Sequence, residues 1–300
     1  MTVLKRLAVL GLMLGMLSAC GSVGPLGETP AAVLAAAADK SEALNSFSVA
    51  FDASESFPAT AAMLSGLGAF GAGGSQEKST VQVALKGTVK VVKPDRIALD
   101  GNVKFNGLAL DFSTVTIGSD TYTRDLFTGQ WKKSTRNGSG AADSGKPLES
   151  LDPATFSDLV KYLTVEDTLA DTDLDGVHVH HYKVKIDGDK LKAELTRRGV
   201  LKAGTNTQAF DDFIKKDAYK MQVWVGTSDH LVRRVTIDID TVTDASIASG
   251  FNLGASPSSG PQSHVVRPAP SPQPVHVTGH AQLDFSDFDK PLDIKPPPVG

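Results

Sequence analysis

Large apolar and polar residues alternate over much of this chain, and that alternation restricts the fold more than any other feature. Between Phe47 and Ser54 the large apolar side chains occupy every second position, and segments 80–91 and 97–105 repeat the pattern. Successive side chains of a strand point to opposite faces of a sheet, so each segment predicts a strand with one apolar and one solvated face. Further segments of this kind are 108–117, 121–124, 165–171, 177–186, 221–225, 231–239 and 275–285.

Turn signals separate these segments. Lys93-Pro94-Asp95 stands between two of them, and Asn106-Gly107 is a dipeptide typical of a tight hairpin. The spacing of strands and turns predicts roughly ten or eleven antiparallel strands.

Helices are few in this sequence. Thr29-Pro30 fits an N-cap followed by proline at the first helical position, and apolar residues at helical spacing predict an amphipathic helix over 31–44. Shorter helices are expected at 153–163 and 207–216. A sheet this large must curl, and so few helices can cover only one of its faces. The predicted class is α+β: a strongly curved antiparallel sheet, an open half-barrel with helices on its concave face.

The alternation assigns one set of side chains to the concave face. Small residues such as Gly87, Gly101 and Gly279 fall in the same rows. Two interpretations stay open for them, because small residues either leave room for a ligand or let a helix pack closely. The assigned apolar side chains are Phe47, Val49, Phe51, Val83, Leu85, Ile97, Leu99, Val103, Phe105, Leu110, Phe112, Val223, Val225, Val235, Ile237, Leu283 and Phe285.

The N-terminus has the pattern of a bacterial lipoprotein signal. A basic pair at 5–6 precedes an apolar run at 7–17, which is shorter than the roughly 20 residues of a membrane span but has the length of a signal-peptide core. The run ends in a lipobox of Leu17, Ser18, Ala19 and Cys20. We expect cleavage before Cys20 and a diacylglyceryl group, with further acylation such as palmitate, on its thiol. The alternative is an ordinary secretory signal with an incidental cysteine.

This prediction divides the chain into a signal peptide at 1–19, a flexible tether at 20–29 and one domain at 30–300. Cys20 is the only cysteine, so no internal disulfide is possible. We expect a monomer, without a cofactor other than its covalent lipid. Membrane lipid would hold it at the outer face of the cytoplasmic membrane or at the outer membrane.

Charge argues against a nucleic-acid partner. Loss of residues 1–19 removes two of the 30 basic residues and none of the 34 acidic ones, which leaves a net charge of −6. A nucleic-acid-binding protein would need a basic face.

Two segments interrupt the strand pattern. Segment 58–75 is rich in alanine and glycine and is expected to be mobile; its apolar side chains either form a lid, or touch a membrane surface, or pack on the sheet as a small helix. Segment 255–274 is rich in serine and proline and is expected to be disordered. The candidate lid residues are Met63, Leu64, Leu67 and Phe70.

Three histidines at 178, 180 and 181 suggest a metal site. On a strand, however, His178 and His180 share one face while His181 points away, so a polar strand face is the favoured interpretation. His276 and His280 are about 13 Å apart on a strand and cannot share one ion.

Three aspartates at 171, 173 and 175 resemble the start of a calcium loop. Tyr182 stands where that loop requires a glutamate, which favours a hairpin turn instead. The chain contains no G-x-S-x-G, P-loop or H-E-x-x-H motif. We therefore expect no metal site and no enzyme.

Short motifs along the chain carry a family resemblance. They are the lipobox, the helix-to-strand stretch 35–47, the strand pair around 92–96, segments 117–122 and 129–131, the pair 223–225 with 230–235, and the ending 285–294. In these the chain resembles the LolA-like lipoprotein carriers, in particular the LppX/LprG-type cell-envelope lipoproteins.

The resemblance implies an apolar cavity between the half-barrel and its helices, lined by the concave-face residues above. Known members carry acylated lipids or lipoproteins. This chain departs from the family in segments 58–75 and 255–274, which bear on the cavity entrance. The expected function is therefore binding or carriage of a lipid or lipidated molecule at the cell envelope. The alternative is an envelope sensor that uses the same fold to bind a protein partner.

Overall fold

The computed structural model describes residues 27–58, 80–105, 107–126, 128–135, 160–197, 218–244 and 274–299. The lipobox, the candidate lid residues and the predicted disordered segment, apart from its last residue, lie outside these ranges, as does the predicted helix at 207–216.

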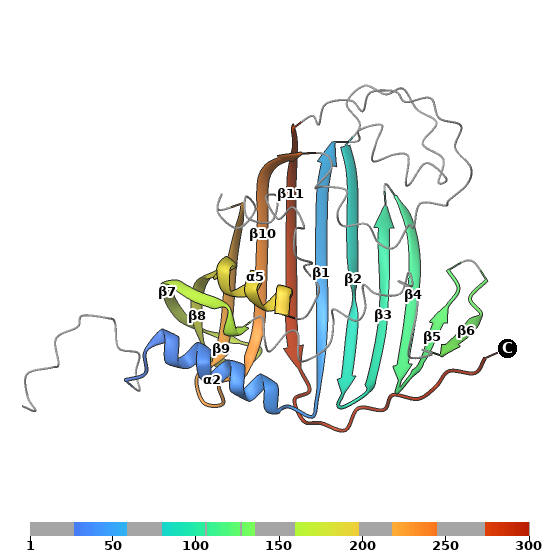
Figure 1. The fold of residues 1–300 in the computed structure, drawn as a ribbon, viewed down its shortest axis with the longest axis horizontal. Coiled ribbons are helices and arrows are strands. Elements are labelled where there is room, and N and C mark those ends of the chain that lie inside the picture. The colour runs from blue at the N-terminus through green and yellow to red at the C-terminus, as the bar shows by residue number, and fades with distance from the viewer. Residues whose placement is uncertain are drawn as a thin grey trace, which may run out of the picture.

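The described strands form one antiparallel sheet of eleven strands, in the order β6-β5-β4-β3-β2-β1-β11-β10-β9-β8-β7 (Figure 1). The first strand therefore pairs with the last, which brings the two halves of the chain into one sheet. The edge strands β6 and β7 do not pair with each other, so the sheet is open. The strands are β1 Ser46–Pro58, β2 Thr80–Val92, β3 Arg96–Phe105, β4 Leu108–Ile117, β5 Asp120–Arg124, β6 Trp131–Thr135, β7 Leu163–Leu174, β8 Val177–Ile186, β9 Tyr219–Gly226, β10 Val232–Asp244 and β11 Pro274–Ser286.

Two helices are described, α2 at Pro30–Ala43 and α5 at Gly188–Arg197. Thr29 caps α2 as predicted, because its hydroxyl accepts a hydrogen bond of 3.3 Å from the backbone amide of Ala32. Both helices lie on the same side of the sheet, in front of the half that β7–β11 form in Figure 1. We call this side the inner face and the opposite side the outer face.

The hydrophobic core lies between α2 and the inner face. The buried side chains of α2 are Val33, Leu34, Ala37 and Ala38, and they form one cluster with buried residues of β8–β11 and β1–β3. The helix reaches this core with one face only, as its predicted amphipathic pattern requires. The predicted α+β class, an open antiparallel sheet with few helices on one face, is confirmed.

The outer face carries ion pairs between neighbouring strands. Asp52 of β1 pairs with Lys86 of β2 at 2.7 Å. On β10, Asp238 and Asp240 pair with His280 and His276 of β11 at 2.7 and 2.6 Å. Alternation thus separates an apolar inner face from a charged outer one.

Two helix predictions need correction. Helix α5 was not predicted, although its N-cap is recognisable in the sequence. The Asp187 carboxylate accepts a hydrogen bond of 3.1 Å from the backbone amide of Lys190. The predicted helix at 153–163 extends too far, because Leu163 already belongs to β7 and pairs with Ile186 of β8; residues 153–159 lie outside the described ranges.

The C-terminal segment 287–299 leaves β11 near the end of α2 and runs along the lower ends of β1–β5 (Figure 1). Asp289 holds the corner between α2 and β1, since its carboxylate accepts the backbone amide of Asn45 at 2.7 Å. Ile294 is buried, and its carbonyl faces the Arg96 guanidinium at 3.5 Å. This segment ties the first and last strands to the same corner.

Candidate functional site

The seventeen predicted concave-face residues lie on the inner face in the strand register. The row through Phe51 shows this, because Phe51 is paired with Leu283 of β11 on one side and with Gly87 of β2 on the other. The neighbouring row joins Val103 to Leu85 of β2 and Leu110 of β4. The structure thus brings the predicted set together on one surface.

Burial divides that set into two groups. Six of its members are buried in the core beside α2: Phe47, Leu99, Val223, Val225, Val235 and Phe285. The other eleven are half-buried: Val49, Phe51, Val83, Leu85, Ile97, Val103, Phe105, Leu110, Phe112, Ile237 and Leu283. The first group supports the fold, so only the second group is a candidate surface for a ligand.

The glycines of the inner face have a role that neither interpretation anticipated. Gly87 and Gly101 are paired across β2 and β3, and each lies under a phenylalanine ring from the adjacent strand, Phe51 and Phe112 respectively. A Cβ on Gly87 would lie 2.5 Å from Cζ of Phe51. Among the described residues, these rings of the sheet itself lie closest above the two glycines.

One acidic residue belongs to the same surface. Glu55 follows Phe51 and Ala53 at every second position of β1 and is paired with Val83 of β2 and Gly279 of β11. Burial raises the pKa of this carboxyl above its ordinary value. The alternation in the sequence already places Glu55 inward, but its charge kept it out of the predicted set.

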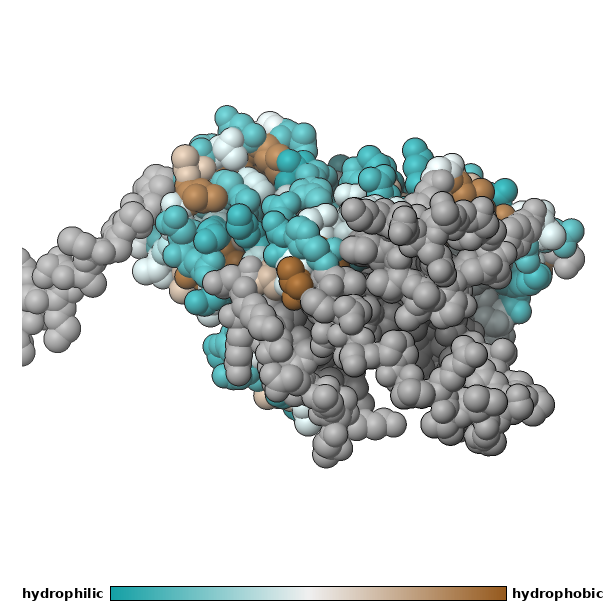
Figure 2. Space-filling model, turned by 90° about the horizontal axis from the view of Figure 1, so that it is seen from above, coloured by the Kyte–Doolittle hydropathy of each residue, from teal (hydrophilic) through white to brown (hydrophobic). Residues whose placement is uncertain are grey.

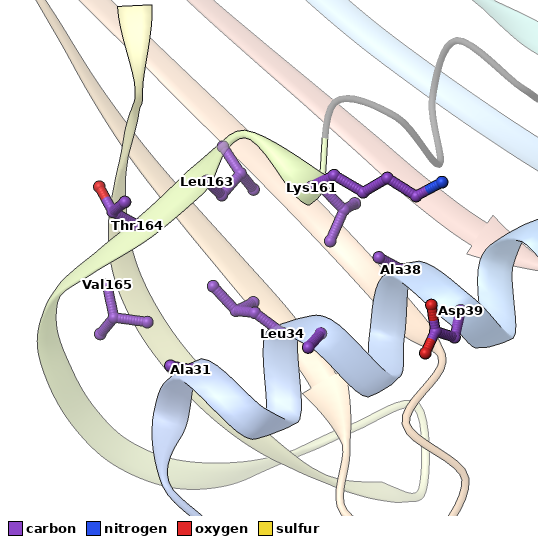
Figure 3. Close-up of a pocket in the computed structure, with 10 residues that line it drawn as sticks. Ala31, Leu34, Ala38, Asp39, Lys161, Leu163, Thr164 and Val165 are labelled. Carbon is purple, nitrogen blue, oxygen red and sulfur yellow. The ribbon is translucent and has the colours of Figure 1, made fainter. Parts of the chain in front are cut away.

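A groove lies between α2 and the start of β7 (Figure 3). Its volume is about 550 Å³. Leu34 and Leu163 point into it from opposite sides, while Lys161 and Asp39 lie at its rim (Figure 3). Lys161 is held there by Glu42 of α2, with its ammonium 2.7 Å from the carboxylate. The groove is therefore mostly apolar with a charged edge.

The described surface in the view of Figure 2 is mostly hydrophilic, with apolar residues in separate small patches. The strand register places the seventeen large apolar side chains named above on the inner face.

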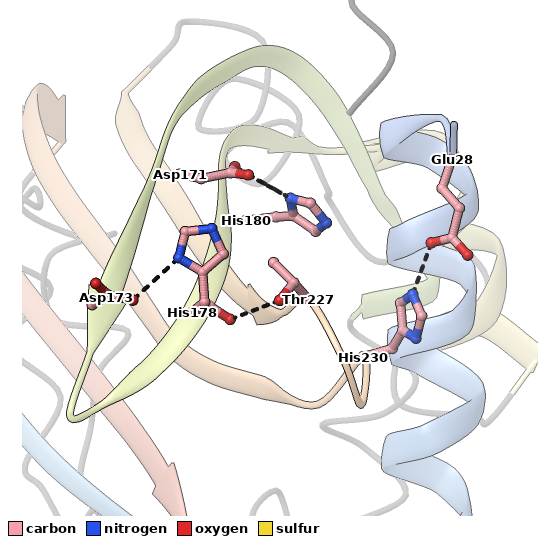
Figure 4. Close-up of polar contacts among 7 residues, drawn as sticks. All are labelled: Glu28, Asp171, Asp173, His178, His180, Thr227 and His230. Atoms are coloured by element: carbon pink, nitrogen blue, oxygen red, sulfur yellow. Dashed lines mark hydrogen bonds and ion pairs between the residues drawn. The ribbon is translucent and has the colours of Figure 1, made fainter. Parts of the chain in front are cut away.

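Two of the three clustered histidines, His178 and His180, each pair with a separate aspartate (Figure 4). The three rings do not converge on one point. His178 lies 3.1 Å from Asp173, and His180 lies 3.2 Å from Asp171. His181 points to the other face, where it contacts Gln222 at 2.7 Å. Within the described ranges no group of three or more His, Cys, Asp or Glu side chains is placed to hold a metal ion.

The stretch that resembles the start of a calcium loop forms the predicted hairpin turn between β7 and β8. Leu174 of β7 is paired with Val177 of β8, and the two residues between them, Asp175 and Gly176, both have positive φ angles of 51° and 80°. This is the backbone geometry of a two-residue hairpin turn.

His230 and Glu28 form a polar contact between the β9–β10 turn and the segment that precedes α2. His230 in the turn between β9 and β10 contacts Glu28 at 2.8 Å (Figure 4). Tyr182 of β8 is buried nearby, with its ring centroid 6.0 Å from that of His180. Burial, followed by the negative charges of Asp171 and Glu28, raises the pKa of Tyr182 to about 12.

No described helix is both long enough and apolar enough to cross a bilayer.

Comparisons with known proteins return structural matches only. No protein-family model and no curated protein sequence matches the chain. The fold is similar to the lipoprotein LppX of Mycobacterium tuberculosis, at 14% identity and a TM-score of 0.41, over 89% of this chain and 100% of that one. It is also similar to LprF from Mycobacterium bovis, at 13% identity and a TM-score of 0.41, over 89% of this chain and 96% of that one.

A LolA superfamily protein from Nitrosomonas europaea matches at 8% identity and a TM-score of 0.21, over 88% of this chain and 94% of that one. The solved structures that match include an LppX protein and a LolA superfamily protein.

Proposed function

We propose that this protein binds a lipid or a lipidated molecule on the half-buried part of its inner face, as a monomer anchored to the cell envelope through Cys20. One observation carries the proposal: seven neighbouring strands, β1–β4 and β9–β11, present an almost wholly apolar inner face. Its buried residues lie beside α2 and, at Val81 and Val277, near the opposite ends of β2 and β11, while eleven large apolar side chains between them are only half-buried. An acyl chain on such a surface gains about 0.8 kcal/mol for each CH₂ group removed from water. Two or more chains would bind tightly without a specific polar contact.

The proposed role is not catalytic. Every imidazole in the described ranges contacts a carboxylate or an amide, and none of these rings is hydrogen-bonded to a described serine or threonine hydroxyl; His264 lies outside these ranges. The contacts are His178–Asp173, His180–Asp171, His181–Gln222, His230–Glu28, His276–Asp240 and His280–Asp238. A hydrolase would need a nucleophile within hydrogen-bond reach of a base.

The test is lipid retention by full-length protein. Native mass spectrometry and solvent extraction of the purified wild type should find co-purifying lipid, and lipid-free protein should take lipid up from vesicles. The informative variant replaces Leu85 and Val103, which are paired on the inner face, with glutamine. Two buried amides without partners would lower lipid retention by about tenfold.

The matched control replaces the next pair in the register, Lys86 and Asn102 on the outer face, with glutamine. It should retain lipid like the wild type. Wild-type protein that neither carries nor takes up lipid would refute the proposal.

One observation favours the alternative of an envelope protein that binds a protein partner. Phe51 and Phe112 fill the space above Gly87 and Gly101, so the middle of the inner face is more filled than a family-type cavity implies. That alternative expects a folded wild type without lipid, and a partner whose capture is lost on deletion of residues 58–75.

A further inference from the structure

The inner face carries a single carboxylate among its described residues on β1–β4 and β9–β11, and that carboxylate is Glu55. Its side chain lies over Gly279 of β11, because a Cβ on Gly279 would be 3.8 Å from Cγ of Glu55 and 3.8 Å from Cβ of Ile239. Val83 is its paired neighbour on β2. Glu55 therefore stands among aliphatic side chains and a bare backbone.

Glu55 differs from the acids of the outer face. Asp52 on the same strand pairs with Lys86 at 2.7 Å, and Asp284 of β11 pairs with Arg234 at 2.5 Å. Glu55 has no hydrogen bond or ion pair with any residue in the described ranges. A carboxylate on an apolar surface without a partner is costly to the fold, which makes a ligand contact a physical reason for its position.

Its place along the strand suits a headgroup. Phe47 marks the buried end of the β1 row beside α2, and Glu55 lies near the opposite end of the strand. The six steps along the strand from Val49 to Glu55 span about 20 Å. One leaflet of a hydrocarbon core roughly 30 Å thick is about 15 Å deep, so an acyl chain fits along this row.

We infer that Glu55 accepts hydrogen bonds from the headgroup of an amphiphile whose acyl chains lie on the inner face. The inference rests on the proposed lipid-binding function and specifies its ligand class: headgroups with N–H or O–H donors. An ammonium and a polyol share this chemistry, whereas a quaternary choline has no donor to offer. Hydrogen bonds to a charged group contribute about 1.5–3 kcal/mol, which corresponds to a preference of about tenfold or more.

The experiment offers full-length protein three lipids with identical dioleoyl chains: phosphatidylethanolamine, phosphatidylglycerol and phosphatidylcholine. Equimolar vesicles are incubated with the wild type, with Glu55→Leu and with Asp52→Asn, and bound lipid is identified by native mass spectrometry. Asp52→Asn is the matched control, because it removes one carboxylate from the outer face of the same strand.

Wild type and Asp52→Asn should favour a donor-bearing lipid over phosphatidylcholine by about tenfold, and Glu55→Leu should bind lipid without that preference. Enrichment of phosphatidylethanolamine alone identifies an ammonium, and enrichment of phosphatidylglycerol alone identifies hydroxyls. Equal uptake of all three lipids by the wild type, or a preference that survives in Glu55→Leu, would overturn the inference while leaving the proposed function intact. Absence of lipid from every variant would instead refute the proposed function.

Discussion

The ring of Phe51 lies against Gly87 on the neighbouring strand, so that a Cβ on Gly87 would be only 2.5 Å from Cζ of that ring. Phe112 has the same relationship with Gly101. These four residues form one register row across β1–β4. The phenylalanines stand at the two ends of the row, and each ring lies over the glycine next to it. The glycines are therefore part of the packing of the inner face.

Gly87→Ala should destabilise the protein by about 1–3 kcal/mol, the usual cost of overpacking. The new methyl group would meet the backbone carbonyl oxygen of Asp100 and the Phe51 ring, and it would lie 2.8 Å from Cα of Gly101, so rotation of one side chain cannot relieve the clash. Urea unfolding followed by circular dichroism measures the change.

Gly279→Ala is the control for that substitution. Its nearest neighbour would be the Ser54 carbonyl at 3.3 Å, and the side-chain atoms of Glu55 and Ile239 would be at ordinary contact distance, so the loss should be clearly smaller. Equal losses at the two glycines would show that the close approach of β3 and the Phe51 ring is not what requires Gly87.

The sequence predicted the inner face correctly because alternation depends only on the local backbone. Phe51 and Gly87 could both be assigned to that face, since the side-chain period of a strand is two. Which neighbouring ring covers a glycine depends on strand order and register, and these link residues far apart in the chain. The two interpretations of Gly87 therefore both missed the side chain that fills the space.

Glu55→Gln should stabilise the protein at neutral pH and change it little in acid. Burial raises the pKa of Glu55 above the ordinary value of a glutamate, so the folded state holds the proton more tightly than the unfolded chain does. Below that value the carboxyl is protonated in both states; as the pH rises through the folded pKa, the wild type loses stability that the glutamine variant keeps.

Melting temperatures of the two proteins at about pH 4 and about pH 7 test this prediction. The gap between them should widen toward neutral pH. A gap that stays constant, or that closes, would mean that the carboxyl is not desolvated on the inner face.

Tyr182 should ionise at higher pH than an ordinary tyrosine, since its pKa is raised to about 12. Asp171→Asn removes one of the charges that raise it and should move the late transition in an alkaline absorbance titration toward lower pH. Tyr182→Phe should abolish that transition. The phenol is fully neutral below the unfolded value, so its contribution to stability is lost as the pH rises through the folded pKa.

Asp173→Asn provides the control for this titration. Asp173 belongs to the same strand and pairs with His178 in the same way, but it is not among the charges that shift Tyr182. If both aspartate variants moved the transition equally, the cause would be the net charge of the hairpin and not the position of Asp171.

Local signals also explain the error in the helices. Helix α5 could have been predicted, because the sequence offers a cap at Asp187 and two leucines, Leu191 and Leu195, one helical turn apart. Leu163 was assigned to a helix because it continues an apolar helical spacing, yet pairing with Ile186 of β8 decides its conformation. Tertiary pairing outweighs local propensity where both patterns fit.

Replacement of Cys20 tests the anchor. Cys20→Ser removes the thiol that would carry the diacylglyceryl group, and each buried CH₂ of such a lipid contributes about 0.8 kcal/mol to membrane binding. The variant should move from the membrane to the soluble fraction and from the detergent to the aqueous phase. Its melting temperature should match that of the wild type, because position 20 precedes every described element. Variant protein that remains on the membrane would indicate a second contact, and deletion of residues 59–75 with Met63, Leu64, Leu67 and Phe70 would then have to release it.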